Sequence, residues 1–502
     1  MDYLDTPLIE LAGKEETGNW TIRHAVEGVQ IFGGIGSGKT SGSGRMLALK
    51  YLKAGFGGLV LTVKPSEKDD WIKYCDLTGR RADLLIVEKE EGNYFNFLDY
   101  ESQGEGETEN IVQVLKTVIR AGEDKEGGGG GDAFWDTALD MLIFNIIDLC
   151  KLAYGTVSVQ KMFDIVQSLP TKASLGNKDK EETVFAAAFK AASSKVEALI
   201  EAWEKKQTAD TLLQLHASNT YEDAYRADIA EARVLDFVDQ FFFANFLNLA
   251  EKTRSIIDFS FSGFLFRLLR DPVYSLFCSH ASTFTPEDCG KGKIILINLP
   301  VKMHHKIGRD SQILFKYIWQ RAMEKRTIEK NTPAVFLWAD EAQNFLHEHD
   351  ADFQATARSS RIATVYISQN LPNYLSNMGG AKSDNRVKGF LGTLGTKIFH
   401  ANADMETNRY ASDLIGDTFF EETSSTATAA GDFSASKTKS LKIDRIVRPE
   451  AFAQLKNGGE HNGMKVEGYM HVQGSSIKDG LNHARIQFDQ DYMNPEKSND
   501  NY

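Results

Sequence analysis

The sequence predicts an α/β fold with a mostly parallel central sheet, interrupted by a long all-helical insertion. A phosphate-loop motif comes early: residues 28–44 read GVQIFGGIGSGKTSGSG, an apolar run and a glycine-rich bend before a lysine–threonine pair. Two runs rich in branched residues follow at 58–64 and 83–87, as expected for strands covered on both faces. From about residue 105 to about residue 282 the apolar spacing becomes helical.

The remaining elements follow in chain order. The phosphate loop leads into a helix over 45–54, and apolar residues at 111, 114, 115, 118 and 119 form one face of an amphipathic helix. Further helical patterns lie at 134–153, 181–205, 224–249 and 256–269, and strand-like runs resume at 293–299, 333–339, 363–368 and 396–401. We expect a nucleotide-binding core at 1–104 and 291–493, an all-α insertion at 105–290, a flexible polar excursion at 421–440 and a disordered tail at 494–502.

Length and composition narrow the functional classes. A chain of 502 residues is too long for one hydrophobic core, so two or three structural units are expected. Its 57 basic and 70 acidic residues give a net charge of −13, which argues against a protein that coats nucleic acid over its whole surface but not against a local basic channel. Four cysteines without C-x-x-C spacing argue against a zinc site or disulfide framework and favour a reducing cytoplasm.

The glycine-rich loop is the first candidate site. We predict that ATP phosphates bind at Gly33, Gly34, Ile35, Gly36, Ser37, Gly38, Lys39, Thr40 and Ser41. The glycines let backbone N–H groups approach a polyphosphate closely, Lys39 reaches the β- and γ-phosphates, and Thr40 offers its hydroxyl to Mg²⁺. The alternative is a chance glycine-rich turn with a solvated lysine.

Two carboxylates end the strand-like run FLWADE. Because the carboxyl ends of parallel strands are where open α/β sheets bind ligands, Asp340 is predicted to hold Mg²⁺ through water. Glu341 is predicted to orient and deprotonate the attacking water. The alternative interpretation of this pair is a helix N-cap.

An arginine and a glutamine complete the predicted catalytic set. Arg358 is suited to neutralising negative charge that develops on phosphate oxygens, and Arg361 is its rival for that role. Gln369, at the end of the next strand, can donate an amide hydrogen bond to the γ-phosphate. The histidines at 304, 305, 347 and 349 match no usual metal-ligand spacing, so we do not assign them a metal.

The motifs stand in the chain in the order GGIGSGKT, the helical insertion, GKIILINLP, FLWADEAQNF, ARSSRIATVYISQN and LGTKIFHANADMETNRYASDLIG. This order resembles that of the conjugative coupling ATPases of type IV secretion, the TraG/TraD-like family within the HerA/FtsK group of translocases. The resemblance covers most of residues 28–416. It implies a RecA-like P-loop NTPase core, a homo-hexameric ring with ATP between subunits, and DNA passing through a central channel. It places Arg358 at the arginine-finger position and Gln369 at the sensor position.

Some features depart from that family. Coupling proteins usually begin with membrane-spanning helices, whereas no stretch here approaches the roughly 20 apolar residues that a span requires. The sequence after the second strand is Val-Lys-Pro-Ser instead of an Asp-x-Lys-Gly-like motif, and Lys64 keeps only a general expectation of phosphate or DNA contact. We therefore expect a cytoplasmic protein, with recruitment to the inner face of the membrane by a partner as an alternative.

The predicted function is an ATP-hydrolysing, sequence-nonspecific DNA translocase in conjugation or in a related mobile-element or defence process, with a relaxase or membrane-channel protein as a further partner. Two alternatives stay open. One is a nucleotide-switched adaptor that recruits protein partners through its helical domain, and the other is a protein-translocating ATPase. The helical insertion and the negative net charge favour the adaptor.

Overall fold

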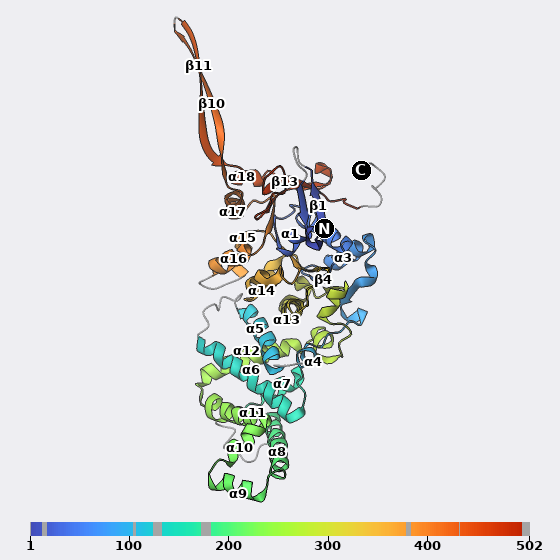
Figure 1. Ribbon diagram of the computed structural model, residues 1–502, viewed down its shortest axis with the longest axis vertical. Helices are drawn as coiled ribbons and strands as arrows, with labels where there is room; N and C mark the ends of the chain where they lie inside the picture. The colour runs from blue at the N-terminus through green and yellow to red at the C-terminus, as the bar shows by residue number, and fades with distance from the viewer. Residues whose placement is uncertain are drawn as a thin grey trace. The chain divides into compact units, whose positions relative to one another are not determined.

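The structure is a computed structural model of the chain that describes residues 2–12, 18–103, 107–123, 133–171, 182–377, 383–430 and 432–493. The chain forms two compact units, described separately below (Figure 1). Unit 1 comprises Met1–Ile86, Pro286–Lys302 and Trp319–Tyr502, and unit 2 comprises Val87–Thr285 and Met303–Ile318. The domain borders expected at 104/105 and 290/291 stay a prediction, and the tail at 494–502 lies outside the described residues.

Unit 1 is built on a nine-stranded sheet in the order β13-β12-β9-β3-β8-β7-β4-β6-β5. From β9 to β6 the paired strands are parallel, whereas β12 pairs antiparallel with β9 and β13 antiparallel with β12. The bounds are β3 Val29–Phe32, β4 Gly57–Leu61, β5 Leu84–Val87, β6 Ile294–Ile297, β7 Val335–Ala339, β8 Ile362–Ser368, β9 Thr396–His400, β12 Lys465–Val472 and β13 His483–Asp489. The predicted mostly parallel sheet is confirmed.

The central strands form because their residues are apolar on both faces. Every residue of β3, β4, β7 and β8 is buried, the pattern of a parallel sheet covered on both sides. At Gly58 in β4, a Cβ atom would lie 2.5 Å from the carbonyl oxygen of Phe336 in β7, so only glycine fits this close approach.

Shorter elements cover and border this sheet. They are β1 Pro7–Leu11, β2 Gly18–Thr21, α1 Ile22–Val26, the π-helical turn η2 Thr40–Gly44, α2 Arg45–Lys53, α3 Ser66–Leu77, α14 Asp350–Ala357, α15 Leu371–Asn377, α16 Ser383–Gly392, α17 Met405–Ile415 and α18 Pro449–Phe452. Helix α13, Val301–Glu324, begins and ends in unit 1 and has its middle residues in unit 2.

A long hairpin replaces the polar excursion predicted at 421–440. Strands β10 Asp417–Ala430 and β11 Asp432–Arg445 pair antiparallel along their whole length, and the hairpin projects from α17 and α18 (Figure 1). The prediction relied on the scarcity of large apolar residues, but threonine is a good strand former without them. Three threonines of β10, at 423, 426 and 428, lie on this ladder.

Unit 2 is all-helical among its described residues. Its helices are α4 Phe97–Glu101, α5 Glu107–Glu123, α6 Ala133–Tyr154, α7 Val159–Gln167, α8 Val184–Glu204, α9 Ala209–Ala217, α10 Tyr221–Asp228, α11 Ala230–Asp239 and α12 Glu251–Leu268. The predicted apolar face of α5 is buried, as at Ile111, Val114 and Leu115. In the described part of the chain, no single helix is long and apolar enough to cross a membrane. The helical segments 137–154 and 159–167 together reach the length and apolar composition of a span, but the chain bends by 110° between them.

Candidate nucleotide-binding site

The predicted phosphate loop follows β3 and leads into η2 and α2. Gly36 and Gly38 have φ angles of +70° and +78°, which side chains other than glycine rarely adopt. At Gly33, a Cβ atom would lie 2.4 Å from Ser37 Oγ. The loop therefore has the tight, left-handed backbone that brings N–H groups close to a polyphosphate.

An open cavity of about 730 Å³ lies against this loop. Residues 36–41 form one wall. The rest is lined by the cations Arg45, Lys64 and Lys73, which outnumber the acids Asp70 and Asp76, and by Tyr74 and Leu77 of α3. Ser37 Oγ is buried without a hydrogen-bond partner inside the protein. A glycine cradle, an unpaired hydroxyl and a cationic cavity of this size fit a nucleotide with its phosphates on the loop.

The two strand-end carboxylates reach the loop from β7. The Thr40 hydroxyl donates a hydrogen bond of 2.8 Å to Asp340 Oδ2, and Asp340 Oδ1 accepts one from the Glu341 N–H at 2.8 Å. The Lys39 ammonium lies 3.8 Å from Glu341 Oε1. The structure thus brings together the predicted lysine, threonine and both carboxylates.

Gln369 joins the same cluster from the end of β8. Its side-chain amide nitrogen donates to Glu341 Oε1 at 3.3 Å, and its backbone carbonyl oxygen accepts a hydrogen bond from Asn402 Nδ2 at 2.8 Å. The alternative role of the Asp-Glu pair as a helix N-cap receives no support, since Glu341 precedes only a short 3₁₀ turn and makes no side-chain cap bond. Glu341 instead has a left-handed backbone, with φ 48°.

Sequence reasoning missed Gln343. Its amide nitrogen donates to Glu341 Oε2 at 2.9 Å, and its oxygen accepts from the Ser368 hydroxyl at 3.0 Å. Gln343 and Gln369 therefore hold one carboxylate oxygen of Glu341 each. The only signal was its place two residues after Glu341, where the tight turn folds it back.

A third carboxylate, Glu67, also went unpredicted. It lies in the first turn of α3, just after β4, and is buried near Asp340 and Lys64. Burial, followed by the charge of Asp340, raises the pKa of Glu67 to about 8. Burial also raises the pKa of Asp340, which the Lys64 charge and the Thr40 hydrogen bond oppose. Lys64, left without a specific role by the sequence, thus belongs to this cluster.

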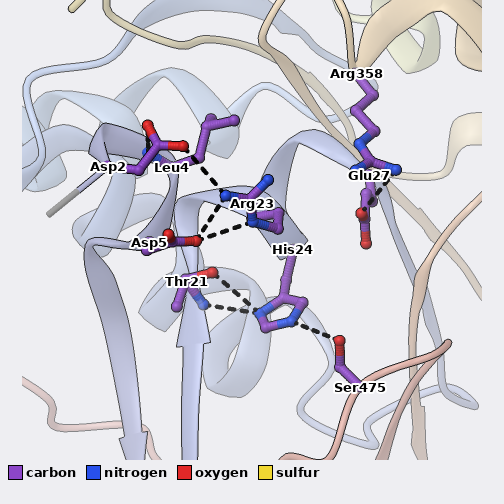
Figure 2. Close-up of polar contacts among 9 residues, drawn as sticks. All are labelled: Asp2, Leu4, Asp5, Thr21, Arg23, His24, Glu27, Arg358 and Ser475. Atoms are coloured by element: carbon purple, nitrogen blue, oxygen red, sulfur yellow. Dashed lines mark hydrogen bonds and ion pairs between the residues drawn. The ribbon is translucent and has the colours of Figure 1, made fainter. Parts of the chain in front are cut away.

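Arg358 lies away from the phosphate loop of its own chain. It precedes β8 whereas Gln369 follows it, so a seven-residue strand of roughly 3.3 Å per residue separates them. Arg358 Nη1 pairs with Glu27 Oε1 at 3.4 Å, and its side chain is 60% exposed (Figure 2). The structure therefore does not bring Arg358 together with the other predicted catalytic residues of the same subunit.

Arg361, the alternative candidate for this role, is buried and bonded to the protein backbone. It is 8% exposed, and its guanidinium donates to the carbonyl oxygens of Thr332 at 2.7 Å and Lys330 at 3.1 Å. The guanidinium also lies over the aromatic ring of Tyr3, with its carbon 5.2 Å from the ring centroid, a cation–π contact. Arg361 has neither the exposure nor the free donors that a phosphate-contacting arginine requires.

The histidines form no metal site within the described ranges. No group of three or more His, Cys, Asp or Glu side chains among those residues is placed to hold a metal ion by itself. His347 is buried with its Nδ1 3.7 Å from Asp350 Oδ2. The cysteines at 75, 150, 278 and 289 are buried free thiols.

Comparison with known proteins gives one family-model match and several solved structures of similar fold. The family model described as the TraM recognition site of TraD and TraG matches residues 334–457, which include the two carboxylates and Gln369. No curated protein matches the sequence. Three solved structures of the coupling protein TrwB are similar in fold over nearly the whole chain.

The unbound TrwB structure, described as a bacterial conjugative coupling protein, is 14% identical with a TM-score of 0.60, covering 95% of this chain and 87% of that one. The complex with a non-hydrolysable ATP analogue is 13% identical with a TM-score of 0.59, covering 98% and 90%. The complex with ADP and Mg²⁺ is 14% identical with a TM-score of 0.59, covering 93% and 86%. At this identity the likeness establishes the fold, a RecA-like P-loop NTPase core with an all-α insertion. The family-model match at 334–457 supports the predicted resemblance to the TraG/TraD-like coupling proteins of type IV secretion, and TrwB shares the fold.

Proposed function

We propose that this chain is the ATPase of a conjugative coupling system, or of a related mobile-element or defence system, and that it moves DNA through a ring of identical subunits. The observation that carries the proposal is the convergence of Lys39, Glu341 and Gln369 beside the glycine cradle. TrwB, which shares the fold, has been solved with ATP-type analogues and with ADP and Mg²⁺. A nucleotide and Mg²⁺ fit the unpaired Ser37 hydroxyl and the cationic cavity described above.

Each residue has a distinct part in this proposal. Backbone N–H groups of 33–41 and the Lys39 ammonium hold the phosphates, while Thr40 and Asp340 hold Mg²⁺, which withdraws charge from the phosphate oxygens when bound. Glu341 accepts a proton from the attacking water. Lys39 pairs with Glu341, and a bound phosphate would compete for the lysine and leave the carboxylate free for water.

The arginine finger acts in trans in this proposal. Arg358 lies before β8 and Gln369 directly after it, so Arg358 lies at the opposite ends of the parallel strands from its own phosphate loop. Its 60% exposure leaves it accessible to a neighbouring subunit. A closed ring satisfies this geometry because every finger then meets a neighbour's ATP, and we propose the hexamer that the resemblance implies.

We further propose a cytoplasmic location with recruitment by protein partners. The family model that matches 334–457 is described as a TraM recognition site, which favours a relaxosome protein as one partner. A net charge of −13 requires that DNA be held in a localised basic channel by its phosphates, with little sequence preference.

DNA binding at increasing salt tests the choice of cargo. We expect linear DNA of unrelated sequences to bind with similar affinity and to dissociate steeply as salt rises from 50 to about 200 mM, because counterion release dominates such binding. Failure to bind DNA in the presence of a non-hydrolysable ATP analogue, with nucleotide-dependent capture of a relaxosome protein, would favour the adaptor. The all-helical unit 2 is the feature that supports that second function.

A further inference from the structure

Only one of the two carboxylate oxygens of Glu67 accepts a hydrogen bond from the described part of the protein. Oε2 accepts a hydrogen bond of 2.7 Å from the Val63 N–H, which fixes the side chain under the turn between β4 and α3. Oε1 is buried and has no hydrogen-bond partner in the protein. The residue as a whole is only 8% exposed. A buried carboxylate oxygen without a donor is costly, so a ligand is expected to complete it.

The surroundings of Glu67 indicate which ligand this is. Strand β4 pairs with β7, and therefore the turn that carries Lys64 and Glu67 lies beside the end of β7 that carries Asp340. Asp340 and Lys64 are the charged groups that act on Glu67. Glu67, Asp340 and Glu341 are three buried acids, and the charges of Lys39 and Lys64 act on them. Two lysines cannot neutralise three buried carboxylates, which favours a cation at this place.

Thr40 marks the place of the cation. Its hydroxyl, predicted to be a Mg²⁺ ligand, donates a hydrogen bond of 2.8 Å to Asp340 Oδ2. Mg²⁺ keeps several water molecules when it binds to one or two protein oxygens and phosphates, and those waters need acceptors. In its described parts the protein supplies no group of three His, Cys, Asp or Glu side chains that could bind a metal alone. Asp340 is predicted to hold the metal through water, and a further carboxylate nearby would act in the same way.

We propose that Glu67 is a third protein group of the Mg²⁺–nucleotide site, where Oε1 accepts a hydrogen bond from water bound to the metal. This inference rests on the proposed nucleotide site and names a further residue of it. Glu67 is a positioning residue, since it touches the metal's water and no reacting atom. Lys64 balances its charge, which gives a role to the lysine that follows β4.

The test measures metal affinity instead of turnover. Fluorescent ADP is titrated with the intact protein in EDTA, and then at fixed ADP with increasing Mg²⁺, for the native chain, Glu67→Gln and the control Asp69→Asn. Glutamine keeps an oxygen acceptor for the Val63 N–H but cannot ionise. The titrations are run at about pH 9, above the raised pKa of Glu67 of about 8, so that the native side chain carries its charge. Asp69 is an exposed acid in the same helical turn, so its replacement removes the same charge away from the site.

We expect Glu67→Gln to weaken the apparent Mg²⁺ affinity by about 10-fold or more, as loss of an outer-shell group does, with unchanged ADP affinity in EDTA. Asp69→Asn should change neither. Unchanged Mg²⁺ affinity in Glu67→Gln, or equal loss of ADP affinity in EDTA, would overturn the inference in favour of a purely structural carboxylate. If thermal unfolding shows that Glu67→Gln does not fold, Glu67→Asp takes its place, because aspartate keeps the charge on a side chain that is too short to reach the same position. Unchanged Mg²⁺ affinity in Glu67→Asp would equally overturn the inference. A native chain that binds no ADP would instead contradict the proposed function itself.

Discussion

The Lys39 ammonium lies 3.8 Å from Glu341 Oε1, and both side chains are buried, so the lysine of the phosphate-loop motif and the proposed general base form one ion pair. The same carboxylate oxygen accepts from Gln369, and its partner oxygen accepts from Gln343. Glu341 is thus held by three donors before a substrate arrives. This preorganisation is what a base that must orient a single water molecule requires.

Replacing Glu341 by glutamine should abolish turnover and leave nucleotide binding intact. The amide keeps the size of the side chain but cannot accept a proton, and loss of a general base costs roughly 10²- to 10⁴-fold in rate. Steady-state ATPase rates and ADP titrations of the variant measure the two effects. Lys39→Ala is the companion variant, which should lose both binding and turnover because it removes the phosphate contact. Full turnover in Glu341→Gln would show that another group is the base.

Gln343 should act on the rate without acting on substrate affinity. Gln343→Ala removes the donor to Glu341 Oε2 and leaves the Ser368 hydroxyl without its acceptor, so Glu341 becomes less well positioned. We expect kcat to fall by about 10-fold with KM nearly unchanged, corresponding to about 1.4 kcal/mol of transition-state stabilisation. A rise in KM alone would indicate that Gln343 contacts the nucleotide instead.

The two arginines should separate in a mixing experiment. Arg358→Ala is expected to lose turnover while keeping ADP affinity and thermal stability, because its side chain is exposed and its one ion pair is weak at the surface. Mixing it with the inactive Lys39→Ala chain should restore part of the activity, since some interfaces then combine a native loop with a native finger. Absence of restoration in mixed assemblies would argue against a finger in trans.

Arg361→Ala should instead destabilise the protein. It removes buried hydrogen bonds to the carbonyl oxygens of Thr332 and Lys330, each contributing roughly 1 to 3 kcal/mol with a charged donor. The measurement is the free energy of unfolding by urea, with Arg358→Ala as the control of equal charge change. If Arg361→Ala keeps full stability and loses turnover, the assignment of the two arginines must be reversed.

Acidification should destabilise unit 1 through His400. Burial, with a smaller effect of the Lys39 charge, lowers the pKa of His400 to about 4. The Nε2 atom of His400 lies 2.7 Å from Ser43 Oγ, and its Nδ1 atom lies 2.8 Å from the Glu467 carbonyl oxygen. Because the unfolded chain takes up this proton near the ordinary pKa of about 6.5, it binds more protons than the folded protein between about pH 6.5 and 4. Stability is therefore full above about pH 6.5 and falls as the pH drops toward 4. Urea unfolding at several pH values should show a shallower fall for His400→Gln, and equal slopes would contradict this cause.

The sequence predicted the parts of the fold in which local pattern and burial agree. The strand-like runs at 333–339, 363–368 and 396–401 correspond to β7, β8 and β9, since fully apolar strands are visible without tertiary information. Strands β12 and β13 were not predicted, because their glutamate and histidines are polar and become buried only when β12 pairs with β9 and β13 pairs with β12. The β10–β11 hairpin was predicted as a flexible polar excursion because the segment lacks an apolar face. Its strand character lies in backbone pairing and in its threonines.

The site followed a similar rule. Lys39, Thr40, Asp340 and Glu341 stand in contiguous motifs, and the strand-end position of Gln369 placed it at the same sheet edge. Gln343 and Glu67 reach the site through turns that no motif encodes, and only the three-dimensional neighbours of Glu341 and Asp340 reveal them. The choice between Arg358 and Arg361 also needed burial and hydrogen-bond partners, which their shared segment ATARSSR does not contain.

The steady-state ATPase rate of the intact chain at low salt, with and without linear double-stranded and single-stranded DNA, tests the central claim most directly. Glu341→Gln serves as the matched control because it keeps the site's shape. We predict a rate that DNA raises several-fold and that is abolished in the control with or without DNA. A native rate that neither form of DNA changes would contradict a DNA-coupled motor and favour a nucleotide-switched adaptor or a protein-translocating ATPase.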